Sequence, residues 1–425
     1  MTIRGRIFQS DFLRRVGLLA SATAIGQLIA VLASPLLTRL YSPDEFGIFS
    51  VFIAILSLVL VVSGLRFELA IPLPRHHSSA FQLVVLALCI NAAVAVFVLL
   101  VLVIVREPIA ALAKTPALAN YLLILPAAVF FAGAYRIFNY WAIRRHNYGL
   151  VARTKLSQSV TNIGIQITTG IAHFGVSGLI VGYILGQVAG VISLARFLKE
   201  SMPTNVRFSV RRMGLVARRQ LNFARYDAPA SVIDTASEQL PAILLATLFS
   251  PAIAGFYMLA QRTLSLPSAV IGQALGQVLY GQCRQAIADR QLGKIVWKMV
   301  YILFGVILVP TIIVMAWGGE IFGLVFGAAW QQSGQFAAWL IIAVAMQFIY
   351  SPISMALMAT EGQHINLLIH SILLVTRLAG ILWGWMHDDA VLAIELFSVS
   401  SLFGFALGIV LVIKRAIAQD NLVGT

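Results

Sequence analysis

Long apolar stretches recur along the chain, roughly every 25 to 35 residues, and short polar segments separate them. Each stretch reaches the roughly 20 residues that a helix needs to cross the hydrocarbon core of a bilayer. Lipid cannot satisfy open backbone groups, so helices are expected. The pattern predicts an all-α polytopic membrane protein. Its twelve transmembrane helices are expected at about residues 16–40, 46–66, 80–105, 118–143, 150–172, 176–198, 222–249, 252–280, 295–317, 335–358, 364–386 and 390–413.

Basic residues gather at alternate ends of these spans. With the N-terminus in the cytoplasm, 22 of the 30 Lys and Arg residues lie at cytoplasmic ends, and three lie at external ends. Cytoplasmic loops of membrane proteins carry this excess, so both termini are predicted to be cytoplasmic. The net charge of +14 therefore follows the membrane topology and does not indicate nucleic-acid binding.

Composition excludes a soluble domain, since 60% of the residues are hydrophobic, 11% are charged and the mean hydropathy is +0.91. Four arginines precede the first apolar run, as in a signal peptide, but the full length of that run favours a retained first span. Cys89 and Cys283 lie in different contexts, which does not suggest a disulfide.

An internal repeat divides the chain. Residues 36–47 (LLTRLYSPDEFG) and 244–255 (LLATLFSPAIAG) are identical at six of twelve positions, at an offset of 208. Six spans separate the copies, so both halves enter the membrane from the same side and form a parallel repeat. The predicted domains are a six-helix bundle at 1–199, a basic cytoplasmic linker at 200–221 and a second six-helix bundle at 222–425.

Charges within the spans are the first candidates for function, because each costs at least about 3 kcal/mol near the bilayer centre and must face protein or water. Guanidinium groups stay charged and bind phosphate with two hydrogen bonds. The candidate cavity arginines are Arg66, Arg136, Arg262 and Arg377. The candidate coupling or gating acids are Asp234, Glu238 and Glu395, of which the first two share a predicted helix face with Asp227.

The expected depth of these charges in the membrane leaves alternative roles open for them. Glu238 and Arg262 flank the turn at Ser250 by similar numbers of residues, so both lie near the midplane and can form a gating ion pair, or Arg262 can contact substrate. Arg377 and Glu395 are a plausible second pair. An anchor at the cytoplasmic surface is the alternative for Arg66, and snorkelling is the alternative for Arg136.

Uncharged positions add a polar lining. Gln158, Asn162 and Gln166 step by four residues and form one polar stripe on the fifth span, suited to hydrogen bonds with sugars. Contacts between helices are the alternative for each of them. Pro229 and Pro241 bracket the acids of the seventh span and permit bends, so this span is the candidate moving element.

Four segments carry a family resemblance: LYSPDEFGIFSVF at 40–52, LRFELAIPLP at 65–74, the long segment at 223–262 that begins FARYDAPASVIDT, and LVFGAAWQQSG at 324–334. They resemble the flippases of polysaccharide repeat units (O-antigen and capsule), which belong to the superfamily of multidrug/toxin extruders and the lipid II flippase. The resemblance implies two bundles in a V-shaped, MATE-like fold in the bacterial inner membrane. It also implies alternating access for an undecaprenyl-pyrophosphate-linked oligosaccharide.

The resemblance implies no enzymatic activity, cofactor or metal, although coupling to H⁺ or Na⁺ is open, with Asp234 and Glu238 as candidate sites. Expected partners are the lipid-linked oligosaccharide, membrane lipids and other membrane proteins of polysaccharide assembly. A multidrug or cation antiporter of the same fold is the first alternative function. A membrane enzyme of polysaccharide assembly is the second, but the short external loops leave little room for a catalytic domain.

Overall fold

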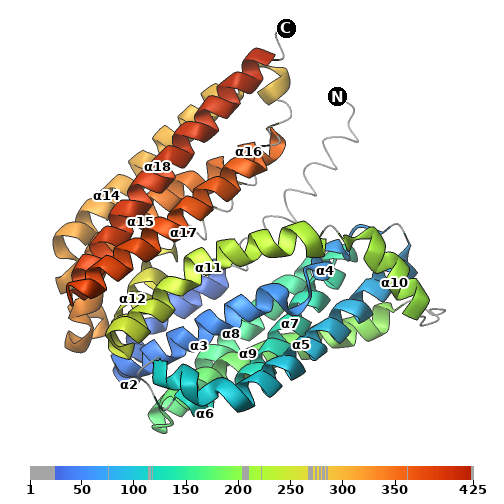
Figure 1. Cartoon of the computed structure of the whole chain (residues 1–425), viewed down its shortest axis with the longest axis horizontal. Coiled ribbons are helices and arrows are strands. Elements are labelled where there is room, and N and C mark those ends of the chain that lie inside the picture. Colours follow the sequence, from blue (N-terminus) through green and yellow to red (C-terminus); the bar gives the residue numbers. More distant parts are fainter. Residues whose placement is uncertain are drawn as a thin grey trace. The chain divides into compact units, whose positions relative to one another are not determined.

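The computed structural model describes residues 24–74, 76–112, 116, 118–202, 210–221, 223–266, 271–272, 275–276, 279, 283, 286–360 and 362–422. Every regular element within these ranges is a helix (Figure 1). The all-α prediction is therefore confirmed.

Nine helices in the described ranges are long and apolar enough to cross a membrane: Pro43–Ser63, His77–Ala111, Leu118–Arg144, Val176–Ser201, Ser231–Phe249, Leu292–Phe326, Ala328–Met358, His364–Met386 and Ala390–Asn421. Three further predicted spans also correspond to helices. The first is the shorter apolar helix Ala24–Leu40. The fifth is α8 (Tyr148–Ile171), which is less apolar because of its polar stripe. The eighth begins as α12 (Pro251–Leu264), and part of its predicted continuation lies outside the described residues.

The chain forms two compact units, each with its own core. Unit 1 comprises Met1–Tyr41 and Ile48–Thr235, and unit 2 comprises Ser42–Gly47 and Ala236–Thr425. Two helices change unit along their length, namely α3 (Pro43–Ser63) and α11 (Ala228–Leu244). The predicted domain boundaries around 199 and 222 stay a prediction.

Unit 1 is built on a buried aromatic core. Its principal helices are α5 (His77–Leu112), α7 (Leu125–Arg144), α8 and α9 (Val176–Ser201). Helix α9 packs against both α7 and α8, and α5 packs against α7. Trp141 is fully buried in this core, contacts Phe81 edge-on and donates its indole N–H to the Ser201 hydroxyl at 2.9 Å. Unit 1 also contains the short helices α2 (Ser34–Leu40), α4 (Phe67–Ala70) and α6 (Leu118–Leu122).

Unit 2 is centred on α15 (Gln331–Ile353), which packs against α12, α14 and α18. The other long helices are α14 (Leu292–Phe326), α17 (Gln363–Met386) and α18 (Ala390–Leu422), and the short elements are η4 (Ala328–Trp330) and α16 (Met355–Ala359). Phe348 and Phe405 are buried where α15 and α18 meet. In the same unit, the buried Trp330 makes edge-on contacts with Phe46 and Phe256.

The repeated segments adopt the same local structure. Ser42 and Ser250 accept hydrogen bonds at 3.3 Å from the backbone N–H three residues later, and a proline follows each serine at the first helical position. Glu45 also accepts a bond from the backbone N–H of Ser42 at 2.7 Å, which completes a capping box at the start of α3. The shared serine and proline therefore serve the same function in both copies.

The two copies also contact each other through their glycines. A Cβ atom built on Gly47 would overlap the carbonyl oxygen of Pro251, and one built on Gly255 would overlap the carbonyl oxygen of Pro43. All four residues belong to unit 2. Helices α3 and α12 thus begin in a reciprocal backbone contact that leaves no room for a side chain.

The predicted basic linker contains a helix, α10 (Val210–Arg219), while residues 203–209 and 222 lie outside the described part. The arginines at 211, 212, 218 and 219 are all exposed. Val216 and Ala217 pack against the core of unit 1, where α10 contacts α5. Helix α10 is therefore an amphipathic helix that packs on unit 1 through apolar residues.

Candidate functional site

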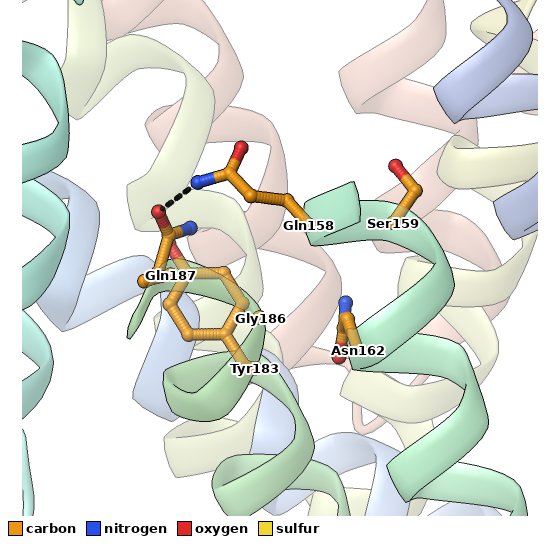
Figure 2. A pocket seen from close by; sticks show the side chains of 6 residues that line it. All are labelled: Gln158, Ser159, Asn162, Tyr183, Gly186 and Gln187. Carbon is orange, nitrogen blue, oxygen red and sulfur yellow. Dashed lines mark hydrogen bonds between the residues drawn. The ribbon is translucent and has the colours of Figure 1, made fainter. Parts of the chain in front are cut away.

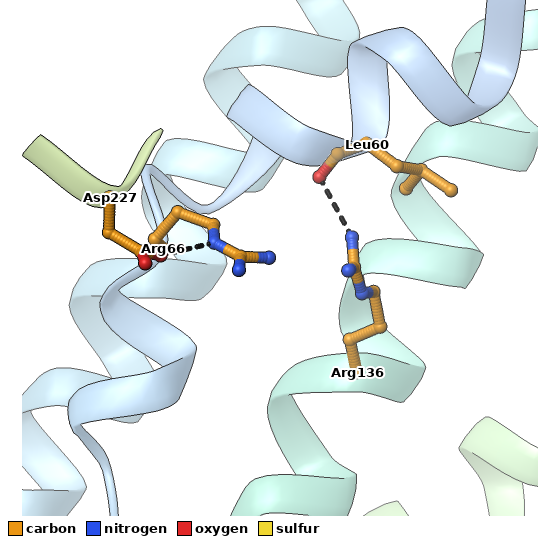
Figure 3. Close-up of polar contacts among 4 residues, drawn as sticks. All are labelled: Leu60, Arg66, Arg136 and Asp227. Atoms are coloured by element: carbon orange, nitrogen blue, oxygen red, sulfur yellow. Dashed lines mark hydrogen bonds and ion pairs between the residues drawn. The ribbon is translucent and has the colours of Figure 1, made fainter. Parts of the chain in front are cut away.

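A charged cluster lies in unit 1 beyond the C-terminal end of α3. That helix ends at Ser63, and Leu65 and Arg66 adopt positive φ values of 46° and 61°, so the chain turns sharply before α4. The turn directs the Arg66 side chain to Asp227, whose carboxylate accepts a bond from the guanidinium Nε at 2.7 Å (Figure 3). The Arg66 side chain is 18% exposed and that of Asp227 is 43% exposed, so this ion pair is accessible to water.

Asp227 belongs to a π-helical turn, η1 (Phe223–Asp227), and α11 begins at the next residue. A π turn breaks the 100° periodicity of an α-helix, so the predicted single face shared by Asp227, Asp234 and Glu238 does not extend through it. Asp234 and Glu238 are exposed on α11. Asp227 instead serves as the partner of Arg66.

Arg136 extends from α7 toward the same turn. Its guanidinium donates to the backbone carbonyl of Leu60 at 3.0 Å, and the Ser63 hydroxyl donates to the same oxygen. Leu60 is in the last turn of α3, whose carbonyls lack partners within the helix, so a cation is stabilised there. In Figure 3 the terminal nitrogens of Arg66 point toward Arg136. The two arginines therefore come from different elements and lie around one region.

Glu68 is the buried member of this cluster. Glu68 is 3% exposed, and its Oε2 atom has no hydrogen-bond partner among the residues that the structure describes. Burial raises the pKa of the Glu68 carboxyl, against the lowering effects of its own backbone N–H, Arg136 and Arg66. The cluster thus combines two half-buried cations with a buried carboxyl whose charged form is disfavoured.

The polar stripe of α8 faces a stripe of glycines on α9. A Cβ atom on Gly182 would lie 2.6 Å from the side chain of Gln166, and one on Gly186 would lie 3.0 Å from that of Asn162. Glycines at every fourth position let the two helices approach closely. The predicted stripe therefore lies along a helix–helix contact, and its members have different roles.

Gln166 has a structural role. It is buried, and its amide donates to the carbonyl of Leu179 on α9 at 3.1 Å. Its own backbone carbonyl accepts a bond of 2.6 Å from the hydroxyl of Tyr41. These contacts correspond to the predicted alternative for this position, a polar contact between helices.

A polar cavity of about 150 Å³ opens at the other two positions of the stripe. Its lining consists of Gln158, Ser159, Asn162, Tyr183, Gly186 and Gln187 (Figure 2). The amide of Gln158 donates to Gln187 at 2.8 Å, so the two side chains form one polar wall. In the described part of the chain, the buried Oδ1 atom of Asn162 has no hydrogen-bond partner. The cavity therefore offers amide groups to a hydroxylated ligand.

Sequence reasoning missed Ser159 and Tyr183 as lining residues. The four-residue spacing of Tyr183 and Gln187, beside the glycines at 182, 186 and 190, is the pattern that indicates a polar face opposite the α8 stripe. Ser159 lies next to Gln158 but off the four-residue stripe, so periodicity alone does not select it.

Arg377 has a buried environment in unit 2. It is 7% exposed, donates to the Ser401 hydroxyl at 2.8 Å, and its guanidinium carbon lies 4.7 Å from the ring centre of Phe397 and 5.4 Å from that of Phe405. Within the described residues no ion pair joins Arg377 to Glu395, so the pairing of these two residues stays a prediction. Hydrogen bonding and aromatic contacts stabilise this cation instead.

The remaining candidates in unit 2 lie on α11 and α12. The Glu238 carboxylate is an electrostatic neighbour of Tyr257 and Arg377, a relation that sequence spacing did not reveal. Arg262 is half-buried near the end of α12. Its role as a substrate ligand or gating partner stays a prediction.

Helix α11 has irregular ends. The π turn η1 precedes it, and a second π turn, η2 (Leu245–Phe249), follows it. Pro241 lies inside the helix and is buried, whereas Pro229 is exposed in the first turn. These features are consistent with a helix that bends, but its movement stays a prediction.

In the part of the chain that the structure describes, no three His, Cys, Asp or Glu side chains come close enough to hold a metal ion. Coupling to H⁺ or Na⁺ stays a prediction.

Several membrane transporters are among the solved structures that this chain resembles. An inward-facing multidrug resistance MATE family transporter of the MOP superfamily matches with a TM-score of 0.75 and 12% identity, over 93% of this chain and 96% of that one. The lipid II flippase MurJ, in an inward closed conformation, matches with a TM-score of 0.71 and 14% identity, over 96% and 90%. A MOP superfamily transporter from Pyrococcus furiosus matches with a TM-score of 0.65 and 14% identity, over 96% of both chains. The chain therefore has the MATE-like fold of multi-pass membrane transporters, as predicted.

Comparison of the sequence with known protein families identifies the family of this chain. Residues 36–335 match the model of the polysaccharide biosynthesis protein family, and the chain belongs to that family. It is also 23% identical over 264 residues to the succinoglycan biosynthesis transport protein ExoT of Rhizobium meliloti (strain 1021). That match covers 60% of this chain and 50% of the relative, so the chain spans about half the length of the curated relative. The predicted family is confirmed, and the proteins named here are transporters and flippases rather than enzymes.

Proposed function

We propose that this chain is a flippase that moves an undecaprenyl-pyrophosphate-linked oligosaccharide from the cytoplasmic to the periplasmic leaflet by alternating access. Membership of the polysaccharide biosynthesis protein family supports a saccharide cargo. The observation that carries the proposal is the pair of arginines in unit 1, because two guanidinium groups around one region suit a diphosphate. The proposed location is the bacterial inner membrane with both termini in the cytoplasm, as the distribution of basic residues predicts.

The physical task of such a flippase is solvation. The polyprenyl tail is stable in lipid, whereas each unsatisfied polar group of the headgroup costs several kcal/mol in hydrocarbon. In the proposal, Arg66 and Arg136 bind the diphosphate, and the cavity at Gln158 and Asn162 accepts sugar hydroxyls. Each provides polar contacts that replace water during the crossing.

The alternative of a cation antiporter is less well supported. An organic cation requires an unpaired acid in an apolar pocket, whereas the acids of the unit 1 cluster are Asp227, which is paired with Arg66, and the buried Glu68. The described residues that line the α8–α9 cavity offer amides and hydroxyls, and none of them has a carboxylate. These observations favour an anionic, hydroxylated substrate.

Translocation in proteoliposomes tests the proposal directly. The purified chain is reconstituted with a fluorescent polyprenyl-pyrophosphoryl oligosaccharide, and the fraction that reaches the outer leaflet is measured with a lectin that cannot cross the bilayer. We expect Arg66→Gln and Arg136→Gln to reduce the rate at least about tenfold, since each removes a charged hydrogen bond to the diphosphate. The matched control is Arg153→Gln, which removes an exposed arginine of α8 that lies away from the cluster.

A second assay uses cells. Deletion of the gene is expected to leave lipid-linked repeat units on the cytoplasmic leaflet. Equal translocation with and without the chain, or transport of an organic cation in place of the lipid-linked saccharide, would refute the proposal.

A further inference from the structure

Glu68 differs from the other charges of its cluster because water does not reach it. It is 3% exposed, yet the charges that act on it come from three elements: Arg66 at the start of α4, Arg136 on α7 and Asp227 in η1. Helix α4 packs against α7 and η1, which explains how residues so far apart in the chain meet here. A buried carboxyl thus lies among the groups proposed to bind a diphosphate.

The hydrogen bonds of Glu68 are incomplete. Its Oε2 atom has no partner within the described residues and lies 2.5 Å from the position that a Cβ atom on Gly64 would occupy. A buried carboxylate oxygen without a donor is destabilised, and protonation removes the charge that requires one. The local packing therefore favours the neutral acid, while the two arginines favour the ionised form.

The protonation state of Glu68 determines the net charge of the cluster. With Glu68 ionised, two arginines and two carboxylates sum to zero. With Glu68 protonated, the same four groups carry one positive charge. An incoming diphosphate would place further negative charge beside the carboxyl, which makes the protonated state more favourable.

We propose that Glu68 is a proton-binding site linked to substrate binding, so that the cluster takes up one proton on Glu68 when a diphosphate binds at Arg66 and Arg136. The inference rests on the proposed function and specifies how its anion site is regulated. The proton comes from solvent and converts the carboxylate to the carboxylic acid, with no change in oxidation state. By linkage, acid conditions strengthen diphosphate binding, and diphosphate binding strengthens proton binding.

Other ionisable groups lie on the helices and turns that neighbour Glu68. Tyr140 on α7 is an electrostatic neighbour of all four members of the cluster. Arg144 on α7 donates to the carbonyls of Ile71 and Pro72, His77 at the start of α5 lies 3.4 Å from Arg145, and Arg225 in η1 is exposed. The charges that act on the Glu68 carboxyl are those of Arg136, Arg66 and Asp227.

The experiment measures proton uptake on binding. Purified full-length chain in detergent is titrated calorimetrically with a short-chain polyprenyl-pyrophosphoryl N-acetylglucosamine. This diphosphate diester does not titrate between about pH 5 and about pH 8, so any pH dependence belongs to the protein. Titrations in two buffers with different ionisation enthalpies give the number of protons taken up.

The wild-type chain is expected to take up a substantial fraction of one proton and to bind about tenfold more tightly at about pH 5.5 than at about pH 8, which corresponds to a change of one pKa unit on binding. Glu68→Gln, a neutral isostere, is expected to bind equally at both pH values without proton uptake. Glu107→Gln is the control, because Glu107 is an exposed glutamate at the far end of α5. It is expected to behave as the wild type.

A second measurement does not depend on the variant. The infrared difference spectrum of the wild-type chain is expected to gain a carboxylic C=O band when the diester binds. Binding that Arg66→Gln weakens, but that brings neither proton uptake nor this band, would overturn the inference and leave the proposed function intact. Proton uptake that persists in Glu68→Gln would also overturn it. Absence of diester binding at every pH would overturn both proposals.

Discussion

The reciprocal glycine contact between α3 and α12 gives a prediction that depends on backbone geometry alone. A methyl group at Gly47 overlaps the carbonyl oxygen of Pro251, and a methyl group at Gly255 overlaps that of Pro43. Backbone carbonyls within a helix cannot rotate away as a side chain can. The two helices must therefore separate by about 1 Å or more before either alanine fits.

The expected magnitude follows from that separation. Overpacking at a close-packed site costs about 1–3 kcal/mol, and we expect this loss for Gly47→Ala and for Gly255→Ala separately. Since either methyl group separates the same pair of helices, the second is then accommodated more easily. The double variant should lose at least about 0.5 kcal/mol less than the sum of the single losses.

The assay is reversible unfolding of the purified chain in mixed micelles, with SDS as denaturant and tryptophan fluorescence as the signal. The control is Gly305→Ala, because a Cβ atom at Gly305 on α14 meets no atom within 4 Å. That change should be neutral or slightly stabilising, since alanine favours the helix. Strict additivity of the two losses, or losses no larger than that of the control, would refute the reasoning.

Three further predictions concern the charged and helical elements. Because burial raises the pKa of Glu68, the native state binds this proton more tightly than the unfolded state does. The free energy of unfolding should therefore fall as the pH rises from the unfolded-state pKa of Glu68 through its native-state pKa. The measurement is the unfolding of the wild type and of Glu68→Gln across this pH range, and an equal pH dependence of the two unfolding free energies would contradict the prediction. Arg377→Ala should destabilise the chain by roughly 2–4 kcal/mol, because it removes the hydrogen bond to Ser401 and the aromatic contacts. A variant that loses transport while its free energy of unfolding is unchanged would instead indicate that Arg377 contacts the substrate. Replacing Pro229 and Pro241 together by alanine should slow translocation without preventing membrane insertion, as measured in proteoliposomes, and an unchanged rate would exclude α11 as the moving element.

Much of the fold was predictable because the bilayer restricts the possible structures. Apolar length alone located the long spans, and the short polar gaps located the turns. Helix α8 was predicted with the other spans from its length, although its polar stripe lowers its hydropathy. Irregular backbone was not predictable, and neither π turn beside α11 has a signal in the hydrophobic pattern.

The sequence predicted which residues belong to the candidate site but not which of them contact each other. The polar stripe on α8 was recognised from the sequence. The positions of the glycines on α9 determine that Gln166 contacts that helix and that Gln158 and Asn162 line a cavity. Arg66 and Asp227 are separated by 161 positions, so spacing along one helix could not join them. Such contacts depend on how helices that are distant in the sequence pack together, and the local periodicity of the sequence carries no information about that packing.

The left-handed backbone at Arg66 has a consequence for how this region tolerates change. A side chain with a Cβ atom is strained there, and glycine at the same position would relieve that strain and raise the stability of the chain. Glycine would also remove the guanidinium that pairs with Asp227. A selection for thermal robustness alone should therefore accept Arg66→Gly, whereas a selection that requires polysaccharide export should reject it, so position 66 separates the demands of folding from those of transport.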